Sequence, residues 1–325
     1  MLVKLLKTTR PAALLSFFGI AVLFFALQLL HLSDYSFKQI GYPLFDLAQY
    51  LLFSNKWLAA ILVFVLSLLM AMGFNNLISE KGVLKYNTVL PASVLIVFVS
   101  IFSFSPVWLA VFLMLFFLNK LLGVYQNERP YAVLFDAAFL LGMSVLIYPP
   151  TIFLFPIIYI ANLTYSAVGW RNYVIPILGF ISPLLMMACY LFFVDALTLY
   201  IEHYLRMLNL SLPSMGIALS EGIFFVLLAI LLLSAFKELV QWIALKSLRS
   251  RKAFIVFLAY FLFSLLGFFT LAADGLQHLL VLAFPIAALI ANYLLFARKW
   301  WWYEVLFALF LLSAIYFHLS QVFGL

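Results

Sequence analysis

The sequence is poor in charge. Charged residues make up 9% of its 325 residues and hydrophobic residues make up 68%, whereas a soluble domain carries about 25% charged residues. A water-soluble protein could not cover its surface with so few charges, so lipid must surround most of the side chains. Segments in which apolar and polar residues alternate are scarce as well, which favours helices over a β-barrel as the spanning structure.

Cysteine and the common chemical motifs are scarce too. The single cysteine, Cys189, excludes an internal disulfide. The chain lacks a Walker loop, a Gly-rich dinucleotide turn, a CxxC pair and an HExxH motif. Its apolar runs also lack the buried charges that are expected of an ion-coupled pump. The sequence therefore shows no signature of nucleotide, zinc-peptidase or ion-pumping chemistry.

Long apolar runs are abundant. A spanning helix needs about 20 apolar residues, and the chain has about eleven runs of roughly that kind. The first run has no small-residue cleavage site behind it, which favours a retained helix over a signal peptide. We therefore predict an all-α, polytopic transmembrane bundle that forms a single membrane domain over residues 1–325. The predicted spans are 12–30, 57–77, 89–104, 107–122, 132–148, 151–168, 174–194, 222–243, 253–271, 276–296 and 303–323.

The stretch 131–170 shows this pattern most clearly. It predicts two helices joined by a Tyr-Pro-Pro corner at 148–150, because proline suits such turns. Asp136 falls within the first helix, about one turn from its inner end. An acid at membrane depth is often functional, and pairing with Arg129 or Arg171 is the structural alternative.

The basic residues predict the orientation. The formal net charge is +7, and the basic residues lie in short connections, which is typical of membrane orientation and not of nucleic-acid binding. Placing the N-terminus inside puts all 18 lysines and arginines on the inner side except Lys38, Lys56 and Arg206. We therefore predict a cytoplasmic N-terminus.

Two predicted outer segments are too long to be simple turns. Residues 31–56 form an outer loop with a helix candidate that starts at Pro43. Residues 195–212 place apolar residues at helical spacing and polar residues on the opposite face. We expect this amphipathic helix to lie flat on the outer leaflet.

Acids and histidines gather on the predicted outer side. One interpretation is that polar residues lie where water is. The other is a catalytic or binding cavity at the outer face, where these groups could bind a metal or transfer protons. The residues concerned are Asp34, Asp46, Asp195, Glu202, Glu221, Asp274, His31, His203, His278 and His318.

Two short motifs carry a first resemblance. Phe-Asp-Ala-Ala at 135–138 begins a predicted helix, and Arg-Asn-Tyr at 171–173 forms a turn before a Pro-x-x-Gly helix. Together with most of the chain, they resemble an uncharacterised family of polytopic inner-membrane proteins from Bacteroidota. This resemblance implies a bacterial inner-membrane location and no particular function.

A second resemblance lies in the stretch 277–290, where Gln-His-Leu-Leu precedes an apolar run with one proline. This stretch is similar to the late helix of C-type-fold glycosyltransferases. The resemblance implies transfer of a sugar from a polyprenyl-phosphate carrier by acids of the first outer loop, often with a divalent metal ion. Asp34 and Asp46 lie on that loop in this chain and would serve as general base or metal ligand.

The first functional hypothesis is an envelope-biogenesis enzyme that uses a lipid-linked sugar at the outer face. Its surface helix would flank the carrier phosphate, for which arginine is a good partner. The predicted site residues are Asp34 and Asp46 for catalysis and Glu202, His203, Arg206, Asp274 and His278 for substrate binding.

The second hypothesis is a non-catalytic scaffold or subunit of an envelope complex. It would dock through its inner basic loops and its outer surface helix. A transporter comes third, and a continuous polar path through the bundle would favour it. The expected partners are the lipid bilayer, a polyprenyl-phosphate lipid and other envelope proteins, with no nucleic acid.

Overall fold

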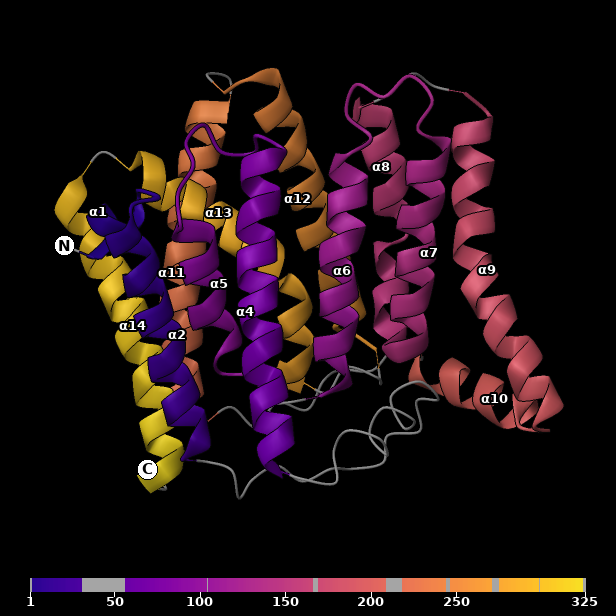
Figure 1. Ribbon diagram of the computed structural model, residues 1–325, viewed down its shortest axis with the longest axis horizontal. Helices are drawn as coiled ribbons and strands as arrows, with labels where there is room; N and C mark the ends of the chain where they lie inside the picture. Colours follow the sequence, from indigo (N-terminus) through magenta and orange to yellow (C-terminus); the bar gives the residue numbers. More distant parts are fainter. Residues whose placement is uncertain are drawn as a thin grey trace.

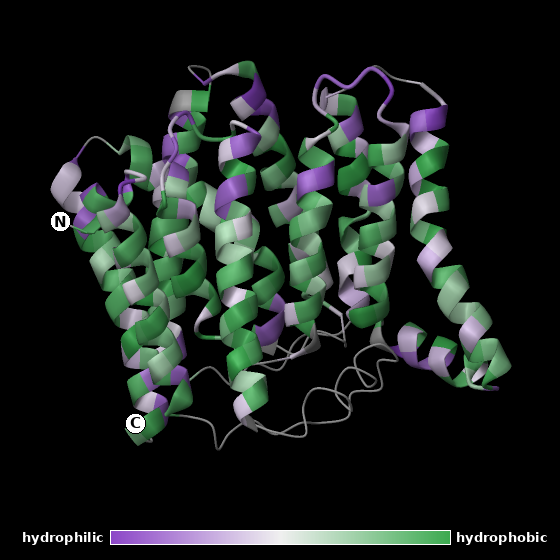
Figure 2. Cartoon of the chain, viewed as in Figure 1, coloured by the Kyte–Doolittle hydropathy of each residue, from purple (hydrophilic) through white to green (hydrophobic). Residues whose placement is uncertain are grey.

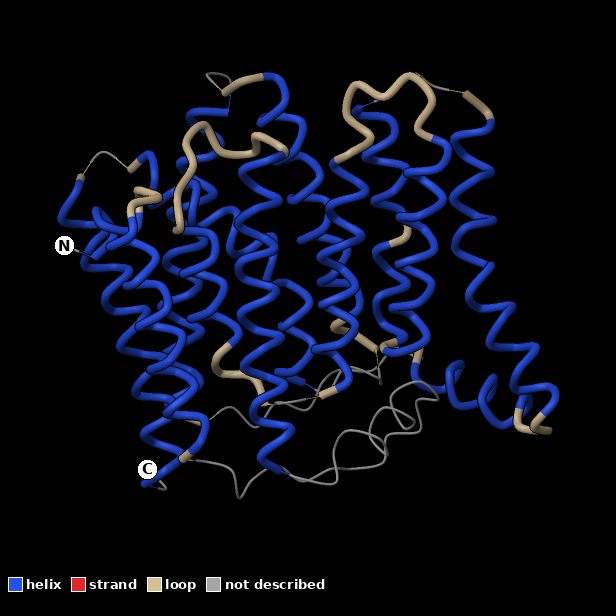
Figure 3. Tube along the Cα trace, viewed as in Figure 1, coloured by secondary structure: helices blue, strands red, loops and turns tan. Residues whose placement is uncertain are grey.

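A computed structural model of the chain describes residues 2–30, 56–103, 105–165, 169–208, 218–243, 246–270, 275–297 and 299–323. These described residues form helices and no β-strand (Figures 1 and 3), which confirms the all-α prediction. The helices, with 3₁₀-helices marked η, are α1 (Leu2–Leu6), α2 (Pro11–Leu29), α4 (Lys56–Glu80), α5 (Leu90–Val99), α6 (Pro106–Leu122), α7 (Tyr131–Ile147), η2 (Pro149–Leu154), α8 (Pro156–Tyr165), α9 (Arg171–Phe193), α10 (Leu197–Met207), α11 (Leu219–Trp242), α12 (Leu248–Gly267), η4 (Gly275–Leu282), α13 (Ala283–Phe296) and α14 (Trp300–Phe323).

The chain is a multi-pass membrane protein. Among the described residues, 7 helices are long and apolar enough to cross a membrane, and they are Pro11–Leu29, Trp57–Glu80, Arg171–Phe193, Leu219–Gln241, Leu248–Gly267, Leu276–Phe296 and Trp300–Phe323. The two predicted hairpins at 89–122 and 132–168 instead contain helices of 10–17 residues, which is below the usual span of about 20. The prediction of about eleven spans is therefore confirmed for seven of them.

The bundle has two ends (Figure 1). We call the end with α1 and the loop 81–89 the N-terminal end, and the end with α10 and Phe323 the C-terminal end. Hydrophilic residues concentrate at both ends, and hydrophobic residues dominate between them (Figure 2). Most of the described lysines and arginines belong to segments at the N-terminal end, while Arg206 of α10 lies at the other. The predicted asymmetry of charge is therefore present, and the cytoplasmic location of the N-terminal end stays a prediction.

The centre of the bundle is the pair α5 and α13, which pack against each other. Every residue of α5 is buried, and so is every residue of α13 from Ala283 to Leu294. A helix that is apolar on all sides belongs in the interior, and the alanines of α13 allow close packing between helices. α4 and α2 cover α5, while α11 covers α13, so the interior here is filled by side chains.

α9 lies at the edge of the bundle and is held mainly by α7 (Figure 1). A Cβ on Gly142 of α7 would lie 2.6 Å from the Phe180 carbonyl oxygen, and one on Gly179 of α9 would lie 2.6 Å from the Phe135 carbonyl oxygen. The two backbones therefore approach as closely as glycine permits, which is a common way to join membrane helices. The opposite face of α9 exposes large apolar side chains, as a lipid-facing helix does.

At the N-terminal end, the first described helix, α1, contacts the start of the last one, α14. Glu304, near the start of α14, accepts hydrogen bonds from the backbone amides of Val3 at 3.1 Å and Lys4 at 2.9 Å. The Lys7 ammonium lies 4.0 Å from the centre of the Tyr303 ring. The first amides of a helix have no partner within it, and a carboxylate there also suits the helix dipole. Glu304 thus anchors α1 to α14.

A candidate binding cavity at the C-terminal end

The structure describes four of the seven predicted site residues. Asp34, Asp46 and Asp274 lie outside the described residues. Glu202, His203 and Arg206 lie together on α10, and His278 lies on η4. α10 packs against α9, at the side of the bundle away from α2 and α14 (Figure 1). The structure therefore does not bring the α10 residues to the helices that surround the bundle centre.

The amphipathic helix predicted at 195–212 is observed as α10, from Leu197 to Met207. Arg206 forms an exposed ion pair with Glu202 at 3.3 Å, one helical turn away. The Tyr204 hydroxyl donates to the carbonyl oxygen of Leu146 at 2.6 Å, which fastens α10 to the end of α7. Exposed leucines on the same helix, such as Leu199 and Leu205, fit the predicted position at the membrane surface.

His278 is a buried tether. Its Nε2 lies 2.9 Å from the Ser264 carbonyl oxygen and its Nδ1 lies 2.8 Å from the Tyr148 hydroxyl. A carbonyl oxygen can only accept, so Nε2 carries the proton and Nδ1 accepts from Tyr148. The side chain is 1% exposed and packs against Gly267. Both ring nitrogens are thus engaged in joining α12 to the Tyr-Pro-Pro corner, and the predicted contact with substrate stays a prediction.

Asp136 has a different partner from the two that the sequence predicted. Its Oδ2 lies 2.7 Å from Nζ of Lys120, the lysine in the last turn of α6, and both side chains are about half exposed. The prediction of Arg129 or Arg171 as the partner was wrong, because α6 packs along α7 and brings Lys120 alongside. The geometry assigns Asp136 a role in joining α6 to α7.

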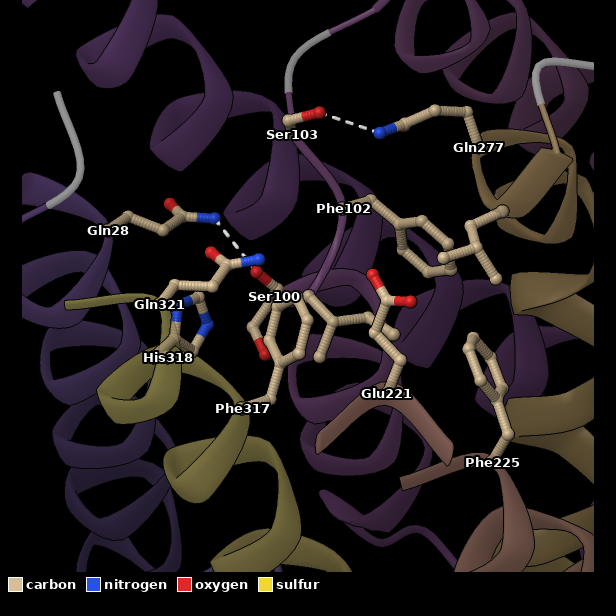
Figure 4. A pocket seen from close by; sticks show the side chains of 12 residues that line it. Gln28, Ser100, Phe102, Ser103, Glu221, Phe225, Gln277, Phe317, His318 and Gln321 are labelled. Carbon is tan, nitrogen blue, oxygen red and sulfur yellow. Dashed lines mark hydrogen bonds between the residues drawn. The ribbon is translucent and has the colours of Figure 1, made fainter. Parts of the chain in front are cut away.

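A cavity of about 190 Å³ opens at the C-terminal end of the bundle (Figure 4). It lies between α2, the segment that joins α5 to α6, α11, η4 and α14. Polar side chains from all five of these elements reach it, although they are far apart in the sequence. Its lining residues are Gln28, Ser100, Ile101, Phe102, Ser103, Glu221, Phe225, Leu276, Gln277, Phe317, His318 and Gln321.

Two glutamines hold the α5–α6 connection across the cavity. Gln28 donates from Nε2 to the Ser100 carbonyl oxygen at 3.1 Å, and Gln277 donates from Nε2 to the Ser103 hydroxyl at 2.6 Å. Gln277 also accepts at Oε1 from the Ser105 hydroxyl at 3.3 Å, and Nε1 of Trp108 donates to the Ser103 carbonyl oxygen at 2.8 Å. The connection leaves the buried end of α5 and needs such partners, because backbone polar groups in an apolar bundle must be hydrogen-bonded.

Glu221 supplies the only carboxylate among the lining residues. Its Oε2 accepts from the Ala218 amide at 3.0 Å and so caps the start of α11, where the helix dipole favours an anion. Figure 4 shows the carboxylate directed towards Phe102. The lining includes no lysine or arginine, so its electrostatics disfavour a phosphate and favour neutral donors or a cation.

His318 closes the cavity from α14. It is buried, and its ring lies 5.4 Å from the ring of Phe317 and 5.9 Å from that of Phe24, measured between ring centres. Phe102 and Phe225 add further aromatic surface. The cavity thus combines amides, hydroxyls, one carboxylate and ring faces, which can orient a small polar group by hydrogen bonds while apolar walls exclude water.

The sequence analysis noted Glu221 and His318 as outer polar residues but missed the glutamines. Gln28, Gln277 and Gln321 each fall at or near the end of an apolar run, and such amides are a usable signal, because a buried amide needs partners. Within the part of the chain that the structure describes, no three His, Cys, Asp or Glu side chains lie together as a metal site.

These features define a multi-pass membrane protein with a polar cavity at one end of an otherwise apolar bundle. The chain belongs to the family of unknown function DUF6427, which matches residues 40–323. No curated protein and no solved structure matches the chain.

Proposed function

We propose that this protein recognises the neutral, hydroxyl-bearing head group of a membrane-embedded molecule, of which a lipid-linked sugar is the best fit. The observation that carries the proposal is the composition of the C-terminal cavity. Its amides, hydroxyls and single carboxylate can donate to and accept from sugar hydroxyls, and its rings supply apolar faces. The carrier lipid would lie along the apolar helices beside it.

The volume of the cavity limits the size of the ligand. About 190 Å³ is less than the roughly 300–1,000 Å³ typical of drug-sized sites. It suits a single ring or a similar small group and excludes a nucleotide. The lining includes no lysine or arginine, which supports a binding mode in which the carrier phosphate lies outside the cavity, because an uncompensated buried anion is costly.

Sugar transfer would extend this proposal. Asp34 and Asp46 remain the proposed catalytic acids, a divalent metal ion remains the proposed cofactor, and a bacterial inner membrane remains the proposed location. Asp34 follows Gln28 by only six positions in the sequence, and Gln28 lines the cavity. Asp34→Asn and Asp46→Asn are expected to abolish transfer and keep sugar binding; transfer that survives both changes would refute the enzymatic extension.

The binding step is tested with the purified full chain in a detergent without a sugar head group. A polyprenyl phosphate that carries one hexose is compared with the same lipid without the hexose, by the ligand-dependent rise in the thermal unfolding midpoint. Glu221→Gln and Gln277→Ala are each expected to weaken the hexose-dependent effect about tenfold, as the loss of one hydrogen bond to a ligand does.

Glu202→Gln is the matched control, because it removes one carboxylate at the same end of the bundle but on α10. It is expected to bind as the unchanged protein does. Equal binding of the two lipids, or full hexose binding by Glu221→Gln, would overturn the proposal. Loss of hexose binding in Glu202→Gln alone would show that the hexose binds at α10 and not in the cavity.

A non-catalytic scaffold is the second candidate, and the filled centre of the bundle favours it. α5 and α13 are buried along almost their whole length by apolar side chains, and this described core offers no polar path of the kind a transporter needs. A scaffold would copurify with a fixed envelope partner and would tolerate Glu221→Gln without a change in that assembly.

A further inference from the structure

A second cavity, of about 400 Å³, lies at the N-terminal end between α11, the end of α13 and the start of α14. The side chains that matter for its chemistry are Lys237, Glu238, Gln241, Tyr293, Lys299 and Trp302. It lies at the opposite end from the polar cavity described above and shares no residue with it.

Two ammonium groups give this cavity its charge. Lys237 and Lys299 are both exposed, and neither ammonium group forms a hydrogen bond or an ion pair with another described residue. The one acid in the lining, Glu238, interacts electrostatically with Lys246. Lys246 itself is fixed by a 2.6 Å hydrogen bond to Asn292. Since Lys246 compensates Glu238, the two free lysines leave the cavity with an excess of positive charge.

The surroundings of the cavity are those of a membrane boundary. Trp302 belongs to a run of three tryptophans at the start of α14, all of them about half exposed, and such rings concentrate at the head-group level of a bilayer. Leu233 and Val240 of α11 lie one turn to either side of Lys237 and are 71% and 74% exposed. An acyl chain could therefore lie along α11 while its head group reaches the lysines.

We propose that this cavity binds the phosphate group of an anionic phospholipid from the leaflet at the N-terminal end. Lys237 and Lys299 contact the phosphate oxygens, Gln241 supplies an amide donor, and Trp302 packs at the glycerol level. Basic pockets between membrane helices are known to hold anionic head groups in this way. The apolar face of α11 beside the lysines is what selects a lipid over a free anion.

The test uses the purified full chain in a neutral detergent at about 0.1 M salt, where surface charges still act over about 10 Å. Dioctanoyl-phosphatidylglycerol, dioctanoyl-phosphatidylcholine and inorganic phosphate are titrated separately, and the dissociation constant is taken from the rise in the unfolding midpoint. The phosphatidylglycerol is expected to bind, and the other two are expected to bind at least tenfold more weakly.

The double variant Lys237→Gln/Lys299→Gln is expected to weaken phosphatidylglycerol binding about 25-fold, roughly fivefold for each lysine near the membrane surface. Both lysines are exposed, so the variant should fold normally. Lys81→Gln/Lys85→Gln removes the same charge from the same end, outside the cavity, and is expected to change binding less than threefold.

Three results would overturn the proposal. The first is equal binding of the two phospholipids. The second is equal binding of inorganic phosphate, which would make this a site for a free anion. The third is a loss of binding in Lys81→Gln/Lys85→Gln as large as that in Lys237→Gln/Lys299→Gln. It would show that the positive charge of the whole N-terminal end, and not this cavity, attracts the phosphatidylglycerol.

Discussion

The two ends of the bundle use different chemistry. The N-terminal end relies on formal charges: Lys120 pairs with Asp136, and Glu304 holds the amides of α1. The C-terminal end relies mainly on neutral groups: Gln28 and Gln277 hold the α5–α6 connection, and His278 holds the Tyr-Pro-Pro corner. Charged groups that keep contact with water position a helix at the membrane boundary at little cost, whereas neutral amides and imidazoles can be buried once they are paired.

The largest expected effect is at the buried tether of the C-terminal end. His278→Ala removes two hydrogen bonds and leaves a gap beside Gly267, so the free energy of unfolding should fall by about 3 kcal/mol. Tyr148→Phe removes only one of the bonds and should cost about 1 kcal/mol. Thermal or denaturant unfolding in detergent measures both, and equal effects of the two changes would contradict the assignment of a double tether.

A smaller effect is expected at the anchor of α1. Glu304→Ala leaves two backbone amides without their carboxylate and should cost about 1–2 kcal/mol, as the loss of a helix cap does. The change is local, so limited proteolysis near α1 is the sensitive measurement. Glu304→Gln keeps an acceptor and should be cut more slowly than Glu304→Ala. Identical cleavage of the unchanged protein and both variants would show that Glu304 does not anchor α1.

A still smaller effect is expected for Lys120→Met. The Lys120 and Asp136 side chains are 44% and 46% exposed, and pairs of this kind contribute about 0–1 kcal/mol. The loss should shrink further at about 1 M salt, where charges are screened within about 3 Å. A loss of more than about 2 kcal/mol in the free energy of unfolding that does not depend on salt would show that this pair is effectively buried. The contrast between water-exposed charges at the N-terminal end and buried neutral groups at the C-terminal end would then be wrong.

A gradual effect is expected with pH at Lys246, which lies in the connection between α11 and α12. Burial lowers its pKa from 10.5 to about 8, and the attraction of Glu238 opposes the change. A folded pKa below the unfolded one means that the folded state prefers the neutral amine, so stability is gained as pH rises through about 8 towards 10.5 and is lost as pH falls. The unfolding midpoint of the unchanged protein should therefore rise over this range relative to Lys246→Met. A difference in unfolding midpoint between the two proteins that stays constant over this pH range would refute the lowered pKa of Lys246.

The sequence predicts the helices well, because an apolar run of spanning length has few alternative structures in a membrane. It predicts the surface helix α10 and the corner at 148–150 for similarly local reasons. It fails for the partner of Asp136, because which lysine lies nearby depends on how α6 packs along α7. It fails in the same way for the C-terminal cavity, whose lining joins Gln28, Glu221 and Gln277 from segments that no local pattern relates.

The contact between Glu304 and the first amides of the described chain also bears on biogenesis. α1 leaves the ribosome before the other described helices, but its anchor belongs to α14, which is made last among them. During synthesis α1 can therefore contact α2 and α5, but it lacks its hydrogen bonds to Glu304 until α14 has been made. A ribosome stalled before α14 should hold a chain whose first helix is open to protease, and release of the full chain should protect it.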